Sequence, residues 1–127
     1  MRTFNTSDAE QLEEYFDIDS SSWIADADNN ILLVDSRGNL AAFEKKANKT
    51  FEGHYFFKDR GKQAVDAALS FLDEMRSMPE VSVIIGIVPL INLGARWLTR
   101  KIGFSSQGIV ETQAATSELF LLVLHEN

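Results

Sequence analysis

The stretch Arg60-Gly61-Lys62-Gln63-Ala64 decides how this chain folds. It follows an aromatic run, Phe51 to Phe57, which alternates like a strand, and it opens an amphipathic helix. Gly61 allows a sharp turn between the two elements. The first backbone N–H groups of a helix have no partner within the helix and lie at the positive end of its dipole. The segment therefore predicts an anion site where the strand meets the helix.

Composition favours one globular domain over residues 1–127. Hydrophobic residues make up 45% of the chain, and nine Phe can supply an aromatic core. The absence of Cys excludes disulfides, thiolate zinc sites and Cys nucleophiles. The sequence shows no His/Asp/Glu cluster at metal-ligand spacing, so we expect no metal.

The chain is acidic, with a net charge of −7. Nucleic-acid binding needs a basic face, and we expect no nucleic-acid partner. The charge either attracts a basic substrate, such as an amine or a Lys-rich peptide, or only keeps the protein in solution. Without an apolar leader or an apolar run that could span a bilayer, we expect a cytoplasmic protein with no membrane partner.

The first half of the chain reads as one helix followed by short strands. Ser7-Asp8-Ala9-Glu10 resembles a capping box, with Ser7 as the cap, and predicts a helix to about Phe16. Turn residues separate the strands that follow, which indicates an antiparallel meander. The expected strands cover residues 2–4, 23–27, 31–35, 40–46 and 50–57.

In the second half of the chain, the spacing of the hydrophobic residues changes from that of a strand to that of a helix. A helix is expected over residues 61–77, with Val65, Ala68, Leu69, Leu72 and Met75 facing the core. The β-branched run at 81–88 predicts a strand covered on both faces. Asn92 caps a helix to about 101, and strands follow at 107–112 and 117–125, the last of them central.

These elements predict an α+β domain with a mixed, mostly antiparallel sheet. The helix at 61–77 joins two strands as a parallel βαβ crossover, and we expect helices on both faces of the sheet.

The order of the motifs resembles the GNAT acyltransferase superfamily, whose members bind acetyl-coenzyme A. The order is a strand, a basic glycine turn, a helix and a second strand. Two motifs follow them, Asn92-Leu93-Gly94-Ala95 and Ile102-Gly103-Phe104. The resemblance is to a short, divergent member, and more loosely to GNAT-like proteins encoded by tailed phages. It implies two splayed central strands with a cofactor-binding crossover. It is weakest over residues 17–33, where a second helix is expected in the family and none is predicted here.

The resemblance implies that residues 60–64 hold the cofactor's pyrophosphate and Asn92 its pantetheine arm. Gln63 and Val65 stand where the family has small residues, so they crowd the cofactor or turn away from it. Apart from the resemblance, residues 60–64 are consistent with an ordinary helix start and Asn92 with an ordinary N-cap. The implied cofactor-binding residues are Phe56, Phe57, Lys58, Arg60, Gly61, Lys62, Gln63, Ala64, Asn92 and Ala95.

The strand before the turn carries the candidate catalytic residues. Glu52 and His54 share one face, and the resemblance implies that one of them is the general base; the alternative is a solvated strand edge. Thr99 stands where many GNAT enzymes have a Tyr that acts as the general acid, and the aliphatic hydroxyl of Thr is far too weak an acid for that role. A backbone N–H within 56–58 is expected to polarise the acyl carbonyl.

Two functions stay open. One is acetyl-CoA-dependent transfer of an acyl group to the amine of a small molecule or peptide. The other is a GNAT-fold module without activity, used in phage assembly or in binding a protein partner or a second copy.

Overall fold

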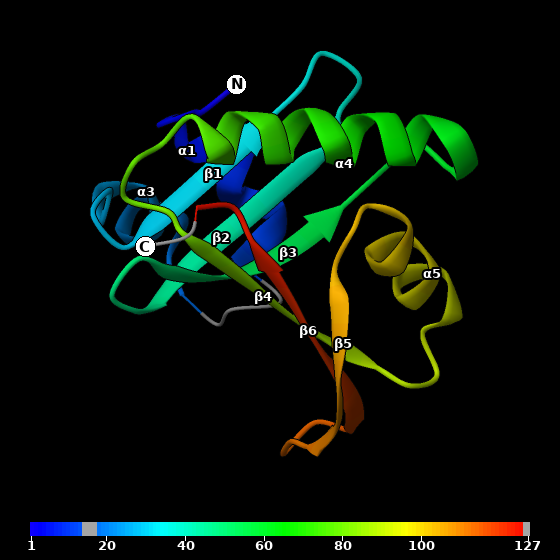
Figure 1. Cartoon of the computed structure of the whole chain (residues 1–127). Coiled ribbons are helices and arrows are strands. Elements are labelled where there is room, and N and C mark those ends of the chain that lie inside the picture. Colours follow the sequence, from blue (N-terminus) through cyan, green and yellow to red (C-terminus); the bar gives the residue numbers. More distant parts are fainter. Residues whose placement is uncertain (14–17, 126–127) are drawn as a thin grey trace.

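The structure is a computed structural model that describes residues 1–13 and 18–125 (Figure 1). A six-stranded sheet has the order β1-β2-β3-β4-β6-β5. The strands are β1 (Asn30–Val34), β2 (Leu40–Ala47), β3 (Thr50–Phe56), β4 (Val83–Pro89), β5 (Ser105–Glu111) and β6 (Thr116–Val123). The helices are α1 (Thr6–Ala9), η1 (Glu10–Leu12), α3 (Ser20–Ala25), α4 (Gly61–Arg76) and α5 (Leu93–Lys101).

The pairing confirms the α+β prediction. Every neighbouring pair of strands is antiparallel except β3 and β4, which are parallel and joined through α4. A parallel connection needs a crossover, and α4 supplies it across one face of the sheet (Figure 1). β6 lies between β4 and β5, so it is an interior strand as predicted.

Hydrophobic packing covers the sheet on two faces. Phe43, Phe51 and Ile84 pack with α4 and with the C-terminal end of α5 in the larger cluster. Leu32 and Ala42 point to the opposite face and meet Trp23 of α3 in a smaller cluster that also contains Ala9 and Leu12. Neighbouring residues of a strand point to opposite faces, which is why β1 and β2 feed both clusters.

Two predictions for the N-terminal part are wrong. Residues 23–27 do not form a strand, because α3 begins at Ser20 and its cap, Asp19, accepts a hydrogen bond from the Ser22 N–H at 3.2 Å. This helix buries Trp23 in the smaller cluster, and it lies in the region where no second helix was expected. Asn5, not Ser7, caps α1. The expected helix continued to Phe16, and residues 14–17 lie outside the described residues.

Other departures are smaller. Leu69 is exposed, and Phe71 takes its place in the core face of α4. Residues 2–4 form no strand, and Arg2 makes an isolated bridge with Leu33. β4 is not covered evenly on both faces, because its side chains alternate between buried and half-buried along the strand. Within the described residues, no helix is long and apolar enough to cross a membrane.

Candidate active site

The site lies where the two parallel strands separate. β3 and β4 pair only from Thr50 to Glu52 and from Val83 to Ile85. Beyond these residues, a cleft of about 670 Å³ opens between the strands, with Gly53 and Gly86 at its inner part. Its walls are mainly apolar, with a few polar groups, as is usual for small-molecule sites.

The structure places most of the sequence-predicted site residues around this cleft. Glu52, Lys58, Lys62 and Gln63 do not line it. The predicted residues that line the cleft are His54, Phe56, Phe57, Arg60, Gly61, Ala64, Asn92 and Ala95.

The N-terminus of α4 opens onto the cleft without a side-chain cap. Arg60 is the N-cap residue in an extended conformation, and no side chain of the described residues accepts from the first turn. Gly61 has φ of 58°, the left-handed conformation that lets the chain turn sharply into the helix. The N–H groups of the first turn are therefore available to an anion, which such a position stabilises by about 0.3 to 1 kcal/mol.

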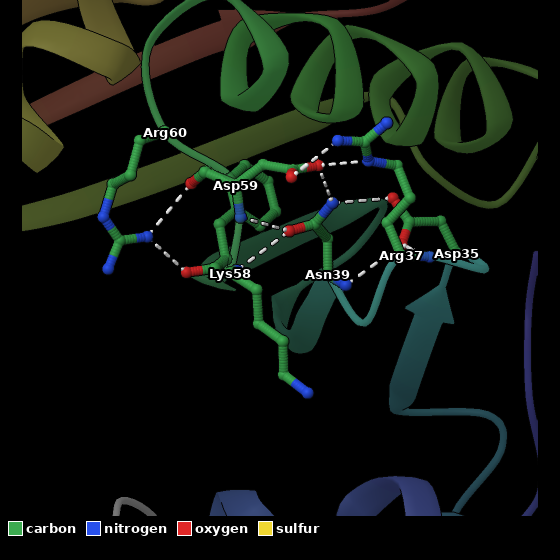
Figure 2. A network of polar contacts seen from close by, with 7 residues as sticks. Asp35, Arg37, Asn39, Lys58, Asp59 and Arg60 are labelled. Carbon is green, nitrogen blue, oxygen red and sulfur yellow. Dashed lines mark hydrogen bonds and ion pairs between the residues drawn. The ribbon is translucent and has the colours of Figure 1, made fainter.

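The Arg60 side chain is held by its own loop. Its guanidinium donates to the carbonyl oxygens of Phe57 at 2.6 Å and Asp59 at 3.0 Å, which closes the loop before α4 (Figure 2). The Lys58 side chain lies against Gly38, where an added Cβ would come within 2.9 Å of Lys58 Cδ. The anion site therefore rests more on backbone donors than on these two basic side chains.

Asn92 has two functions open to it. Its side-chain oxygen accepts from the Ala95 N–H at 3.1 Å, so it caps α5. It also lines the cleft, and within the described residues its side-chain amide nitrogen has no hydrogen-bond acceptor. The cap orients the side chain, and the remaining donor can meet a ligand in the cleft.

Thr99 lines the cleft and is buried, but its proton is already used. Its hydroxyl donates to the Ala95 carbonyl oxygen at 2.7 Å. Tyr55 also lines the cleft, and burial raises the pKa of its phenol, which makes it a poorer acid than an exposed Tyr. Neither hydroxyl offers an efficient general acid.

His54 and Glu52 lie side by side, as predicted. His54 Nε2 lies 3.4 Å from Glu52 Oε2, and only His54 reaches the cleft. Burial lowers the pKa of His54, while the negative charges of Glu52 and Glu44 act against that shift. The result is an imidazole that is mostly neutral at pH 7 and able to accept a proton.

The cleft connects the two faces of the sheet. His54 pairs with Ala42, whose side chain belongs to the smaller cluster, so the imidazole faces away from α4. Tyr55 and Phe57 line the cleft from the α4 face. A ligand held by the N-terminus of α4 can therefore meet a second molecule from the opposite face, beside His54.

Sequence reasoning missed two polar residues that shape the site. Asn39, in the β1–β2 turn, is fully buried and binds the loop before α4 (Figure 2). Glu118, on β6, is buried and binds Arg96 of α5. Both partners lie far away along the chain, so no local pattern reveals them. The described residues hold no group of three His, Asp or Glu arranged to bind a metal.

The likeness to known proteins lies in the fold. No protein-family model matches the chain, and no curated protein matches it in sequence. Solved structures do match. One is the aminoglycoside acetyltransferase AAC(6')-Ib in complex with coenzyme A and kanamycin, with a TM-score of 0.70 and 14% identity, covering 94% of this chain and 91% of that one.

Two further structures show the same likeness. RimJ of Mycobacterium smegmatis, in complex with CoA-disulfide, has a TM-score of 0.68 and 18% identity over 82% of this chain, which spans 58% of the RimJ chain. Spermidine N-acetyltransferase SpeG of Vibrio cholerae, an F149A mutant, has a TM-score of 0.65 and 15% identity, covering 91% of this chain and 75% of that one. The chain has the GNAT acetyltransferase fold, shared with enzymes of low sequence identity.

Proposed function

We propose that this protein is an acetyl-CoA-dependent N-acyltransferase that acts on an amine by direct transfer. The observation that carries the proposal is the cleft between β3 and β4, which begins at the uncapped N-terminus of α4 and ends beside His54. Solved structures of the same fold contain coenzyme A or CoA-disulfide. An apolar slot with an anion site at one end suits a ligand with an apolar arm and a phosphorylated end.

Two parts of the cofactor would be held by named residues. The N–H groups of the first turn of α4, at Gly61, Lys62 and Gln63, would hold the pyrophosphate. Asn92 and Ala95 would contact the pantetheine arm along the cleft wall. When bound, acetyl-CoA supplies an acyl group activated as a thioester.

His54 is the base of the proposed reaction. The imidazole of His54 accepts one proton from the ammonium group, and Glu52, at 3.4 Å, stabilises the resulting positive charge. The neutral nitrogen then attacks the acyl carbonyl carbon, the C–S bond breaks, and the second proton of the nitrogen passes through water to the departing thiolate. The main-chain N–H of Phe57 would polarise the acyl carbonyl, because Phe56 is paired with Leu40 of β2 and the Lys58 N–H is already bound to Asn39.

The acceptor is proposed to be a cationic amine. The chain carries a net charge of −7, which attracts positively charged substrates. Two enzymes of the same fold are an aminoglycoside acetyltransferase and a spermidine N-acetyltransferase. Polyamines and amino sugars are therefore the first acceptors to examine, followed by a Lys-rich peptide.

Thermal unfolding with and without acetyl-CoA tests cofactor binding. A ligand at a hundredfold over its Kd stabilises the folded state by about 2.7 kcal/mol, which is easily seen in Tm. We expect the wild type and Lys45→Glu to show the shift and Arg60→Glu to lose it. Lys45 is exposed on β2, away from the cleft, and makes the same change of charge. A wild type that saturating acetyl-CoA does not stabilise would rule the proposal out.

Release of the coenzyme A thiol in the presence of spermidine, kanamycin or a Lys-rich peptide tests the chemistry. We expect His54→Gln to bind acetyl-CoA as the wild type does and to release thiol at least a hundredfold more slowly. A wild type that binds the cofactor but acylates no amine would favour the second function, binding or phage assembly without catalysis. Ile91 and Leu93, exposed beside the cleft, would then be the surface to examine.

A further inference from the structure

We propose that Asn39 is a positioning residue that holds the loop before α4 in the conformation that binds the cofactor's phosphates. This inference rests on the proposed function. Asn39 lies in the turn between β1 and β2, whereas the loop lies between β3 and α4. The turn and the loop meet only in the folded protein (Figure 2).

Every hydrogen-bonding group of the Asn39 side chain has a partner. Its oxygen accepts from the backbone N–H of Lys58 at 2.9 Å and of Asp59 at 3.1 Å. Its nitrogen donates to Asp35 Oδ2 at 2.9 Å and to Asp59 Oδ2 at 2.8 Å. Asn39 is fully buried, and a buried network in which every member is satisfied defines a single geometry.

The turn that carries Asn39 is itself held in one shape. Asp35 Oδ1 accepts from the backbone N–H of Arg37 at 2.9 Å and of Asn39 at 3.0 Å. Gly38, with φ of 87°, completes the turn. The loop before α4 is therefore tied to a rigid part of the sheet, and the direction of the first turn of α4 follows from it.

The same network controls the negative charge of Asp59. This residue lines the cleft, and its carboxylate, if released from the network, would repel a phosphate bound there. Arg37 binds that carboxylate with two hydrogen bonds, Nε to Oδ2 at 2.7 Å and a terminal nitrogen to Oδ1 at 2.9 Å. Such a bidentate pair offsets the charge and turns it toward the β1–β2 turn.

Asn39 also selects which backbone donors remain available. Because it occupies the N–H groups of Lys58 and Asp59, the donors still open to an anion are those of the first turn of α4. Loss of the Asn39 side chain would free the loop and the Asp59 carboxylate together. The mobile loop and the released carboxylate would both weaken phosphate binding. Contacts to the uncharged arm of the cofactor, deeper in the cleft, would remain.

The test compares coenzyme A with pantetheine, which has the same arm and no phosphate. We expect Asn39→Ala to raise the Kd for coenzyme A at least tenfold and to change the Kd for pantetheine less than twofold, both followed by NMR titration. Asn48→Ala, at the exposed β2–β3 turn, is the matched control and should change neither. Amide exchange of Lys58 and Asp59 in the ligand-free protein should accelerate only in Asn39→Ala.

Arg37→Gln serves if Asn39→Ala does not fold, because Arg37 is exposed. It should weaken coenzyme A several-fold at low salt and leave pantetheine unchanged. An equal loss for both ligands, or an unchanged Kd for coenzyme A, would overturn the role of Asn39 while leaving the proposed function intact. A wild type that binds no coenzyme A would overturn the proposed function, and this inference with it.

Discussion

Glu118 of β6 accepts a hydrogen bond from Arg96 Nε at 3.0 Å, which ties α5 to an interior strand of the sheet. A terminal nitrogen of Arg96 also donates to the Leu90 carbonyl oxygen at 3.1 Å, just before α5. Arg100 binds the other oxygen of Glu118 at 2.5 Å. One buried carboxylate thus positions the helix whose first turn carries Asn92 and Ala95 into the cleft.

We expect Glu118→Gln to lower Tm by several degrees and to weaken acetyl-CoA binding, because Arg96 and Arg100 lose a charged partner. Scanning calorimetry and titration of the cofactor measure the two effects. Glu80→Gln, at an exposed site, is the control.

The contribution of Glu118 to stability should depend on pH. Hydrogen bonds from Ser106 and Arg96 lower the pKa of its carboxyl group. Its stabilising effect is therefore present above pH 4.5 and is lost as the pH falls through the lower pKa of the folded state. An unchanged Tm at neutral pH would contradict this role.

The pKa of His54 should lie below its ordinary 6.5, because burial disfavours the imidazolium. The unfolded chain then binds a proton more readily than the folded chain does. The free energy of unfolding therefore has its full value above pH 6.5 and decreases as the pH drops through the pKa of the folded state. Urea unfolding at pH 7.5 and pH 5 measures the loss, which His54→Gln should reduce. An NMR titration midpoint of His54 at or above 6.5 would disprove the expectation.

Two glycines on the cleft wall should respond in opposite directions to the same substitution. Gly61→Ala should cost about 1 kcal/mol, because φ of 58° is unfavourable for a residue with a Cβ. Gly94→Ala should gain about 0.4 to 1 kcal/mol, because the position is helical and no atom of the described residues lies within 4 Å of an added Cβ. Urea unfolding measures both. A stabilised Gly61→Ala would show that the turn is not strained as described.

Val65 and Ala64 should separate packing from cofactor binding. Val65 packs against the larger core cluster and does not line the cleft, whereas Ala64 does. We expect Val65→Ala to cost about 1 kcal/mol and to leave the Kd for acetyl-CoA unchanged. Ala64→Val should instead raise that Kd at least tenfold. Tighter cofactor binding by Val65→Ala would show that Val65 crowds the cleft after all.

Much of the fold was readable along the chain because local patterns carry it. The alternation from Thr50 to Phe56 and the 3.6-residue period after Gly61 predicted β3 and α4 within a residue or two. Trp23 shows where such reading fails. Trp23 is aromatic and its neighbour Ile24 is β-branched, which suits a strand, but Asp19 caps a helix and the smaller cluster buries the indole. Tertiary packing overrode a weak local preference there.

The sequence by itself determined the order of the elements from β1 onward, the turn at Gly61 and the position of Glu52 and His54 on one face of a strand, since all of these depend on neighbours along the chain. Only the tertiary structure decided what reaches the cleft. The separation of β3 from β4 admits His54 and leaves Glu52 outside it. Asn39 binds backbone groups 19 and 20 residues away, and Glu118 binds an arginine 22 residues away. Such partners are chosen by burial, because a buried polar group must find its hydrogen bonds wherever the fold brings them.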